Sequence, residues 1–260
     1  MKWINKAIID LRAKPSTRSE RVSQALFGTT VKVCRTKDDW SLVETPDGYQ
    51  GFVKTKHLSV PLSPVGSAWK VTEAIVPVRD PATDQVLMQF AFDTGFFAEN
   101  DGDRLVFGLP TGEIGYVPDT FATPARSVSD METLLQLACG FVGTPYLWGG
   151  VSPFGFDCSG FVQRLFHHCF NEWLPRDTAA LRQIGQQITL ENLRQGDLCF
   201  FPGHVALCLN RGRVVHANSH QYGVSVDKLL EPTDAYGEQL LQGFEVARRI
   251  AFSPSFGRTE

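Results

Sequence analysis

The chain has 260 residues, of which 43% are hydrophobic and 20% are charged, and its formal net charge at pH 7 is −3. This length exceeds one typical domain and predicts two or three domains with sizeable cores. Because no run of Lys or Arg accompanies the small negative charge, the composition excludes nucleic-acid binding and attachment to an anionic membrane. Small neutral or zwitterionic substrates suit this charge better than nucleic acid or an anionic membrane does.

The first ten residues contain no apolar core of signal-peptide length, and the sequence contains no apolar run long enough to span a membrane. We therefore expect a cytoplasmic protein without a membrane partner. Four of the six cysteines (Cys34, Cys169, Cys199 and Cys208) lie in apolar segments, where a thiol packs as a small hydrophobe. Since no Cys-x-x-Cys pair occurs, we expect all six to be reduced thiols.

Residues 1–60 and 67–122 are predicted to form two small β-domains. The first range contains short apolar runs separated by turn residues, and a proline-bearing linker at 60–66 ends it. The turn and strand at 46–53 align with those at 110–117 at a constant offset of 64 residues. The second domain would thus be a degenerate copy of the first, although one larger β-domain remains an alternative.

Residues 126–252 are predicted to form a third, α+β domain. Ser129 and Glu132 are spaced as a helix-capping box before an apolar helical pattern. A glycine-rich loop at 143–150, a second helix and three strands at 197–201, 204–210 and 213–219 follow. Helices followed by an antiparallel sheet are typical of the α+β class.

Cys158 stands between Asp157 and Ser159 at the predicted start of that second helix. Helix-terminal N–H groups and the helix dipole stabilise a thiolate there, which is the nucleophilic form of cysteine. His204 and His216 lie on two later strands and complete the residue types of a cysteine hydrolase. The other pair of histidines, His167 and His168, is expected at the surface of the helix.

His204 and His216 can meet only if they share one face of their hairpin, because side chains alternate between faces along a strand. A two-residue loop would place His216 on the face opposite His204. A three-residue loop at 210–212 would pair residue 209 with 213 and set His216 opposite Ala206, on the face of His204. We predict the three-residue loop, with Gly212 in the left-handed conformation.

From about residue 126 to 252 the chain resembles the NlpC-type papain-like peptidases of bacterial cell-wall metabolism. The resemblance rests on six blocks in one order: YLWGG, FDCSGFVQ, LPRD, GDLCFF, GHVALCL and VVHA. The repeated turn followed by Gly-aromatic-Val resembles bacterial SH3-like domains. Together these features resemble the γ-D-glutamyl-L-diamino acid endopeptidases of that family. The resemblance implies two SH3-like β-barrels followed by a papain-like α+β domain, with helices packed on an antiparallel sheet.

The resemblance also implies a catalytic role for each matching residue. Cys158 would be the nucleophile, His204 the general base and acid, and His216 the group that orients His204. A backbone N–H at Cys158 and the Tyr146 hydroxyl would stabilise the oxyanion. No cofactor is implied, because thiol chemistry needs none.

For substrate binding, the resemblance points to Tyr49 in the first domain, which would help to recognise a free N-terminal L-alanine. Glu113 stands at the matching position of the second repeat, so only the first copy has this tyrosine. Glu20 is the candidate for binding the ammonium group. Five further residues map to the walls of the substrate site: Trp148, Asp157, Ser159, Asp177 and Thr178.

The expected substrate is a murein tripeptide or tetrapeptide, cut between γ-D-Glu and meso-diaminopimelate or L-Lys. A glycan-linked stem has no free amine, so the resemblance implies a role in recycling released peptides. An amidase or transferase with the same triad remains an alternative, as does a non-catalytic wall-fragment-binding protein. A zinc site at Cys158, His204, His216 and Asp157 is disfavoured by its spacing. We expect a monomer.

Overall fold

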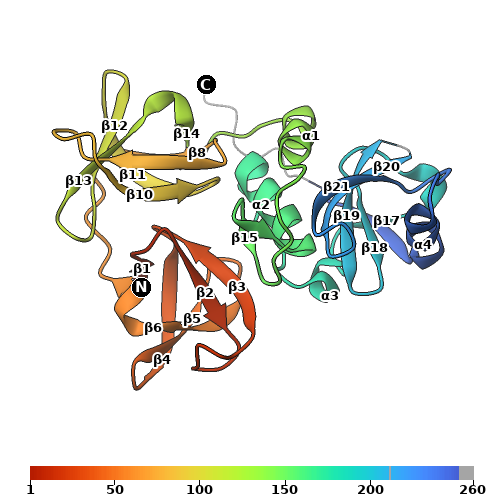
Figure 1. Cartoon of the computed structure of the whole chain (residues 1–260), viewed down its shortest axis with the longest axis horizontal. Helices are drawn as coiled ribbons and strands as arrows, with labels where there is room; N and C mark the ends of the chain where they lie inside the picture. The colour runs from red at the N-terminus through yellow and green to blue at the C-terminus, as the bar shows by residue number, and fades with distance from the viewer. Residues whose placement is uncertain (211, 252–260) are drawn as a thin grey trace.

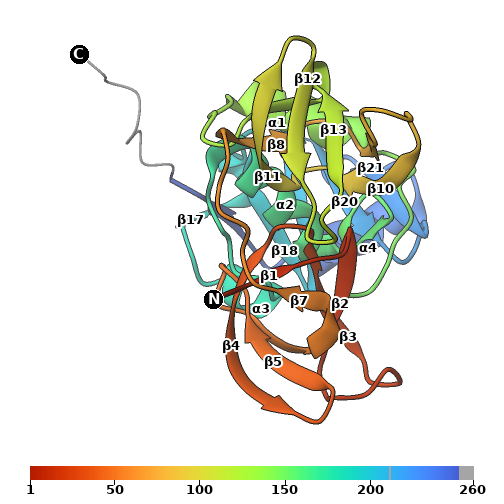
Figure 2. The same cartoon turned by 90° about the vertical axis from the view of Figure 1, so that its left-hand side faces the viewer.

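The computed structural model describes residues 1–210 and 212–251, which form two strand-rich parts and a third part with helices and a sheet (Figure 1). Residues 211 and 252, which belong to the predicted loop and the predicted third domain, lie outside the described residues. Helix α2 stands between the strand-rich parts and the six-stranded sheet of the third part. Figure 2 shows both strand-rich parts in front of the third part.

The first sheet has seven strands in the order β3-β2-β6-β5-β4-β1-β7. Its core contains Ile4, Leu11, Val31, Val43 and Val53. Alternating burial along β2 and β5 shows the period of two that the sequence pattern predicts. The strands are β1 (Lys2–Ile4), β2 (Ile8–Arg12), β3 (Arg21–Leu26), β4 (Thr30–Lys37), β5 (Trp40–Glu44), β6 (Gln50–Lys54) and β7 (Leu58–Ser59).

The second sheet repeats this order strand for strand, as β10-β9-β13-β12-β11-β8-β14. Duplication of one unit would produce this shared topology. The strands are β8 (Ser67–Val71), β9 (Ile75–Arg79), β10 (Val86–Ala91), β11 (Gly95–Asp101), β12 (Arg104–Gly108), β13 (Ile114–Pro118) and β14 (Ala122–Pro124).

Both sheets are open, and the prediction of closed barrels is wrong in this respect. The first sheet ends at β3 and β7 and the second at β10 and β14. No hydrogen-bonded ladder among the described residues joins these end strands. The short 3₁₀ turns η1 (Thr55–His57) and η2 (Asp119–Phe121) precede the last strand of each sheet.

The first and second sheets are joined by an aromatic contact and a close backbone approach. Phe27, which follows β3, packs in the core of the second sheet with its ring centroid 4.9 Å from that of Phe90. Gly28 has a φ of +73°, and a Cβ atom there would lie 2.5 Å from the carbonyl oxygen of Gly95. Only glycine fits at this junction.

The third part contains a six-stranded sheet in the order β17-β22-β18-β19-β20-β21. Helices α1 and α2 share one apolar core with this sheet, and α4 contributes to a second core. The elements are α1 (Met131–Gly140), β15 (Val151–Ser152), β16 (Gly155–Phe156), α2 (Cys158–Phe170), α3 (Thr178–Leu181), β17 (Gln186–Ile188), η3 (Leu190–Asn192), β18 (Leu198–Phe201), β19 (His204–Asn210), β20 (Arg213–Asn218), β21 (Gly223–Lys228), α4 (Ala235–Gly243) and β22 (Val246–Arg249).

Helix α1 begins one residue later than the predicted capping box requires. Asp130 is its N-cap, with the side chain accepting a hydrogen bond from the Thr133 backbone N–H at 2.8 Å. Ser129 instead donates its backbone N–H to the carbonyl oxygen of Cys169, at the end of α2. The predicted capping role of Ser129 is therefore wrong. None of the described helices is long and apolar enough to cross a membrane.

The turn after β10 fixes the second sheet to the side of α2. Phe92 packs edge-on against Phe141 in the core of the third part, with ring centroids 5.0 Å apart. The buried carboxylate of Asp93 accepts hydrogen bonds from Arg164 at 2.9 Å and His167 at 2.5 Å, and it also contacts His168. Although burial opposes ionisation, these groups hold the pKa of Asp93 well below its usual value.

This contact corrects the expectation that His167 and His168 are surface residues. The His168 side chain is 5% exposed and that of His167 is 23% exposed. The sequence of the helix shows only its own apolar face, and the partner turn is about 75 residues away along the chain.

We expect Asp93→Asn to lower the free energy of unfolding by about 3 kcal/mol, because the substitution leaves the Arg164 charge buried without its partner. Urea denaturation of the full chain measures this loss. Asp103→Asn is the control, since the Asp103 side chain is 92% exposed. If both variants lose less than about 1 kcal/mol, the buried ion pair does not hold the two parts together.

Candidate active site

Cys158 is the first residue of α2, where Asp157 caps the helix. One Asp157 carboxylate oxygen accepts the Gly160 backbone N–H at 2.7 Å, and the other accepts the Gly149 N–H at 2.9 Å. Arg176 donates to both oxygens, at 3.0 and 2.6 Å. A Cβ atom at Gly160 would lie 2.2 Å from the Gly150 carbonyl oxygen, so glycine lets the loop pack against the helix. These contacts fix the position of Cys158.

The thiol of Cys158 is 7% exposed. Its Sγ lies 3.7 Å from Thr178 Oγ1, and the backbone of Val205 hydrogen-bonds to it. Burial, and then the nearby charge of Asp157, raise the pKa of the Cys158 thiol above its usual value. The prediction of a thiolate stabilised by the helix is therefore wrong for this resting structure, because desolvation outweighs the helix-terminal N–H groups. A neutral thiol requires a base beside it.

His204 and His216 lie side by side at the start of β19 and in β20. His204 Nε2 is 2.6 Å from His216 Nδ1, and His216 Nε2 is 2.9 Å from Asp227 Oδ2 in β21. Because Cys158 contacts the backbone of Val205, the residue after His204, the thiol lies beside the start of this series. The hydrogen bonds thus join His204, His216 and Asp227 in series, and the Val205 backbone links the start of this series to Cys158.

The register of the hairpin confirms that the two histidines share a face. Leu207 pairs with Val215 and Cys208 with Val214, which sets His216 opposite Ala206. The predicted loop is wrong in detail, because Asn210 pairs with Arg213 after a register shift between Cys208 and Asn210. A bulge in β19, rather than a longer loop, supplies the extra residue.

The hydrogen bonds assign the ring protons when both imidazoles are neutral. The Asp227 carboxylate only accepts, so His216 Nε2 carries a proton and His216 Nδ1 does not. His204 Nε2 must then donate to His216 Nδ1, which leaves His204 Nδ1 unprotonated. Burial, and then the neighbouring His216, lower the pKa of His204 to about 3. His204 is therefore neutral near pH 7, in the form that can accept a proton.

Asp227 is a residue of this site that the sequence analysis missed. Burial opposes its ionisation, yet hydrogen bonds from His216, Ser225 and Gln221 hold the pKa of Asp227 below its usual value. The available signal was the single acidic side chain of the strand Gly223–Lys228, two residues beyond the partner of His216 in the hairpin. No motif marks that position.

The depressed pKa of His204 makes stability depend on pH. In the unfolded chain a histidine has a pKa of about 6.5, so between pH 6.5 and 3 the unfolded state binds a proton that the folded state does not. Unfolding is then favoured as the pH falls. We expect the wild type to lose about 2 kcal/mol more than His204→Gln between pH 7 and pH 5, as measured by urea denaturation. Equal losses would contradict a neutral, buried His204.

Tyr146 lies close to Cys158, and the two groups interact electrostatically. Burial, and then Cys158, raise the pKa of Tyr146 to about 12. The Tyr146 hydroxyl therefore keeps its proton near neutral pH and remains a hydrogen-bond donor. This property suits the predicted oxyanion-binding role of Tyr146, which stays a prediction.

The first sheet reaches this site through its turns. Burial, and then a contact with Asp177, raise the pKa of Tyr49 to about 12, and Tyr49 is hydrogen-bonded to Asp177. The indole Nε1 of Trp148 donates to the Glu20 carboxylate at 2.8 Å. The structure therefore brings four of the predicted substrate-binding residues together in two pairs, and each pair joins the first sheet to the third part.

Two hydrogen bonds, one part-buried and one buried, hold the first sheet at this position. Gln163 of α2 donates to Asp47, beside Tyr49, at 2.8 Å. Arg176 donates to the Ser23 hydroxyl of β3 at 2.9 Å. Asp157 and Ser159 are 6% and 4% exposed and bind Arg176, so the structure shows an internal role for both. Their contact with a substrate stays a prediction.

No group of three or more His, Cys, Asp or Glu side chains within residues 1–210 and 212–251 is arranged to hold a metal ion.

Comparisons with known proteins agree with this architecture. The NlpC/P60 family matches residues 143–239, and the bacterial dipeptidyl-peptidase Sh3 domain matches residues 11–58. A crystal structure of an NlpC/P60 family protein from Bacillus cereus superposes with a TM-score of 0.82, covering 95% of this chain and 98% of that chain at 22% identity. This likeness shows that the two chains share one fold.

Curated relatives extend the comparison to sequence. Dipeptidyl-peptidase 6 of Lysinibacillus sphaericus is 27% identical over 89% of this chain and 92% of its own length. A γ-D-glutamyl-L-lysine dipeptidyl-peptidase of Bacillus subtilis is 28% identical over 92% of this chain and 85% of its own length. Murein DD-endopeptidase MepS/murein LD-carboxypeptidase of Escherichia coli is 32% identical over 48% of this chain and 69% of its own length. This chain therefore belongs to the NlpC/P60 family, and it is a cysteine peptidase of that family.

Proposed function

We propose that the protein hydrolyses the bond between γ-D-Glu and a diamino acid in murein peptides that have a free N-terminal L-Ala. The alignment of Cys158, His204, His216 and Asp227 carries the proposal, because it supplies a nucleophile, a neutral base and a group that orients the base. The Bacillus subtilis relative and a second Bacillus relative are both named γ-D-glutamyl-L-lysine dipeptidyl-peptidase, and these names support the substrate class.

Cys158 is the proposed nucleophile. Its S–H proton passes to His204 Nδ1 as sulfur attacks the γ-carbonyl carbon, and the carbonyl oxygen becomes an oxyanion that the Cys158 backbone N–H and Tyr146 stabilise. Protonated His204 then gives this proton to the leaving amine, which breaks the C–N bond and leaves a thioester. Water loses a proton to His204 and attacks the thioester, and the returning proton restores the thiol. The products are L-Ala-D-Glu and the diamino acid, or a peptide that begins with it.

Two residue pairs, Tyr49 with Asp177 and Glu20 with Trp148, join the first sheet to the third part, and we propose that they recognise the free amine. Glu20 is exposed and held by Trp148, so its carboxylate can pair with an ammonium group. Tyr49 is fixed by Asp177 and lies beside the turn that Gln163 holds. An N-acylated or glycan-linked peptide has no ammonium charge and leaves Glu20 without a partner. This discrimination supports a role in recycling peptides already released from the wall, for which we propose the cytoplasm.

We expect Glu20→Gln to raise KM for a free-amine peptide about tenfold, with little change in kcat, because the lost ion pair acts on binding alone. Steady-state kinetics with L-Ala-γ-D-Glu-L-Lys measures this split. Glu172→Gln is the control, since Glu172 is also exposed but lies in the segment after α2. A KM unchanged in Glu20→Gln would place amine recognition elsewhere.

Identification of the products tests the reaction itself. The protein is incubated with L-Ala-γ-D-Glu-meso-diaminopimelate and, separately, with L-Ala-γ-D-Glu-L-Lys, and mass spectrometry follows both products. Release of L-Ala-D-Glu with the free diamino acid supports the proposal, and the faster peptide defines the preferred diamino acid. Cleavage of the L-Ala bond, or turnover only of non-peptide amides, contradicts it and favours an amidase or transferase.

A further inference from the structure

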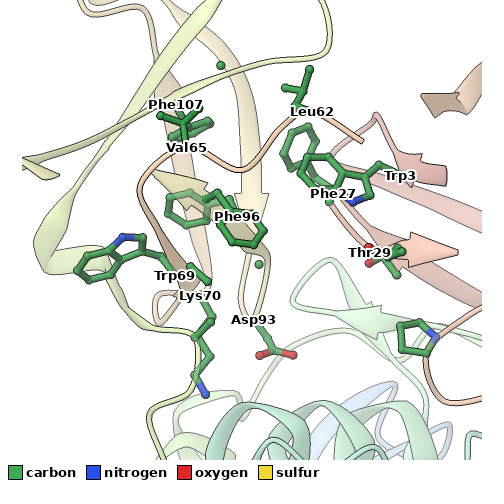
Figure 3. Close-up of a pocket in the computed structure, with 18 of the residues that line it drawn as sticks. Trp3, Phe27, Thr29, Leu62, Val65, Trp69, Lys70, Asp93, Phe96 and Phe107 are labelled. Carbon is green, nitrogen blue, oxygen red and sulfur yellow. The ribbon is translucent and has the colours of Figure 1, made fainter. Parts of the chain in front are cut away.

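A cavity of about 670 Å³ lies where the two strand-rich parts meet α2 (Figure 3). Its volume falls within the range of about 300–1,000 Å³ found for small-molecule sites. Cys158, His204 and His216 do not line it, and its floor contains Arg164 and His167, which lie two to three helical turns from Cys158 along α2. The cavity is therefore separate from the proposed catalytic groups.

The walls of the cavity are aromatic. Figure 3 shows Trp3 and Phe27 of the first part on one side, facing Trp69 and Phe96 of the second part. Phe27 is 4% and Phe96 6% exposed, so these rings are rigidly packed. The rim is apolar too, with three exposed side chains: Leu62 at 37%, Val65 at 56% and Ile114 at 55%. Apolar side chains exposed together around a cavity are typical of a binding site.

The floor of the cavity is charged and contains unused hydrogen-bond donors. Arg164 is 5% exposed, and its Nη1 donates to Asp93 at 2.9 Å. Its Nε has no partner among the described residues, and the same is true of Nε1 of Trp69 in the wall. Buried donors without acceptors are rare in folded proteins because each costs about 1–3 kcal/mol. An occupant of this cavity would therefore be favoured if it supplied acceptor oxygens.

The charges around the floor favour an anion. Arg164 and Lys70 are cations there, His167 adds positive charge when protonated, and Asp93 is the one carboxylate beside them among the described residues. Lys70 donates to the Ser127 and His168 carbonyl oxygens and to Asn171, so its ammonium group is fixed. Glu99 of β11 also lines the cavity, and among the described residues it forms no ion pair with these cations.

We propose that this cavity binds an amphiphilic carboxylate, a molecule with an aliphatic or aromatic body and one carboxylate group. The body packs between the aromatic walls, and the carboxylate lies at the floor against the guanidinium group of Arg164. A planar carboxylate fits this position because a guanidinium group offers it paired N–H donors. The bound molecule would touch all three parts of the chain at once.

Isothermal titration calorimetry of the full chain with 4-pentylbenzoate tests the proposal, and uncharged 4-pentylbenzamide is the matched ligand. We expect the acid to bind with a Kd at least about tenfold lower than that of the amide. Arg164→Gln should remove this preference. Because that substitution also breaks the contact with Asp93, a second variant is needed that leaves the charged floor intact.

Gly108→Phe is that variant. Gly108 lines the cavity, and a Cβ atom there would meet only the end of Leu62, at 4.0 Å, so the new side chain can enter the cavity without displacing backbone. We expect it to weaken binding of the acid at least about tenfold, whereas Gly140→Phe, added in open space at the end of α1, should not. No binding of the acid at millimolar concentration, equal affinity for acid and amide, or unchanged binding in Gly108→Phe would overturn the proposal.

Discussion

Cys158→Ala is expected to abolish peptide hydrolysis, with a fall in kcat of about 10⁴-fold or more. The thiol is the only group proposed to form a bond with the substrate carbonyl, and removal of a catalytic nucleophile leaves only the contribution of binding and oxyanion stabilisation. Stopped assays with L-Ala-γ-D-Glu-L-Lys, sampled over hours, measure the residual rate. Thermal unfolding of the variant shows whether the fold is retained.

Cys139→Ala is the matched control, because Cys139 is an exposed free thiol in α1. It should keep full activity. The Cys158→Ala variant should still bind the peptide in calorimetry, since the groups proposed to bind it are unchanged. Undiminished hydrolysis by Cys158→Ala would refute a thiol mechanism, and undiminished biological function without hydrolysis would favour the wall-fragment-binding alternative.

Asp227→Asn is expected to lower kcat by about 10² to 10⁴-fold with little change in KM. The amide can donate as well as accept, so His216 no longer has a fixed tautomer and His204 loses its fixed donor role toward His216. Asp227 acts through His216 and touches no substrate, so it is a positioning residue. A structural role alone would lower stability and leave the kcat of the folded fraction unchanged.

The pH profile separates these roles. In the wild type, neutral His204 is present well below pH 7, so kcat should persist on the acid side. In Asp227→Asn the acid side of the kcat-against-pH profile should shift, because the positions of the ring protons around His216 have changed. Asp227→Glu should recover part of the rate by restoring an acceptor, and Asp101→Asn, at an exposed position in β11, should change nothing. An unchanged kcat and profile in Asp227→Asn would remove Asp227 from the mechanism.

Local patterns were sufficient to predict the parts of the structure that local chemistry determines. The strand alternation of the first 60 residues follows from period-two burial, and the start of a helix at Cys158 follows from the helical spacing of its apolar residues. Strand geometry left two arrangements of His204 and His216 open, and the register confirms the predicted one, in which they share a face. The route to that register was not predicted, because a β-bulge and a longer loop give the same pairing at the histidines.

Contacts between distant segments account for what the sequence did not predict. Asp93 lies in a turn whose sequence gives no sign of the three side chains that surround it, and His168 is buried only because that turn covers it. For Cys158, helix position predicted a low pKa, whereas burial has the larger effect, and burial depends on the complete fold.

The decisive measurement is kcat/KM of the wild type for L-Ala-γ-D-Glu-L-Lys and for its N-acetylated twin, with mass spectrometry of the released lysine. We expect rapid release from the free peptide and a rate at least about 100-fold lower from the acetylated one, since acetylation removes the charge that Glu20 is proposed to bind and adds bulk beside Tyr49. Equal rates for the two peptides, or release from neither, would contradict this expectation.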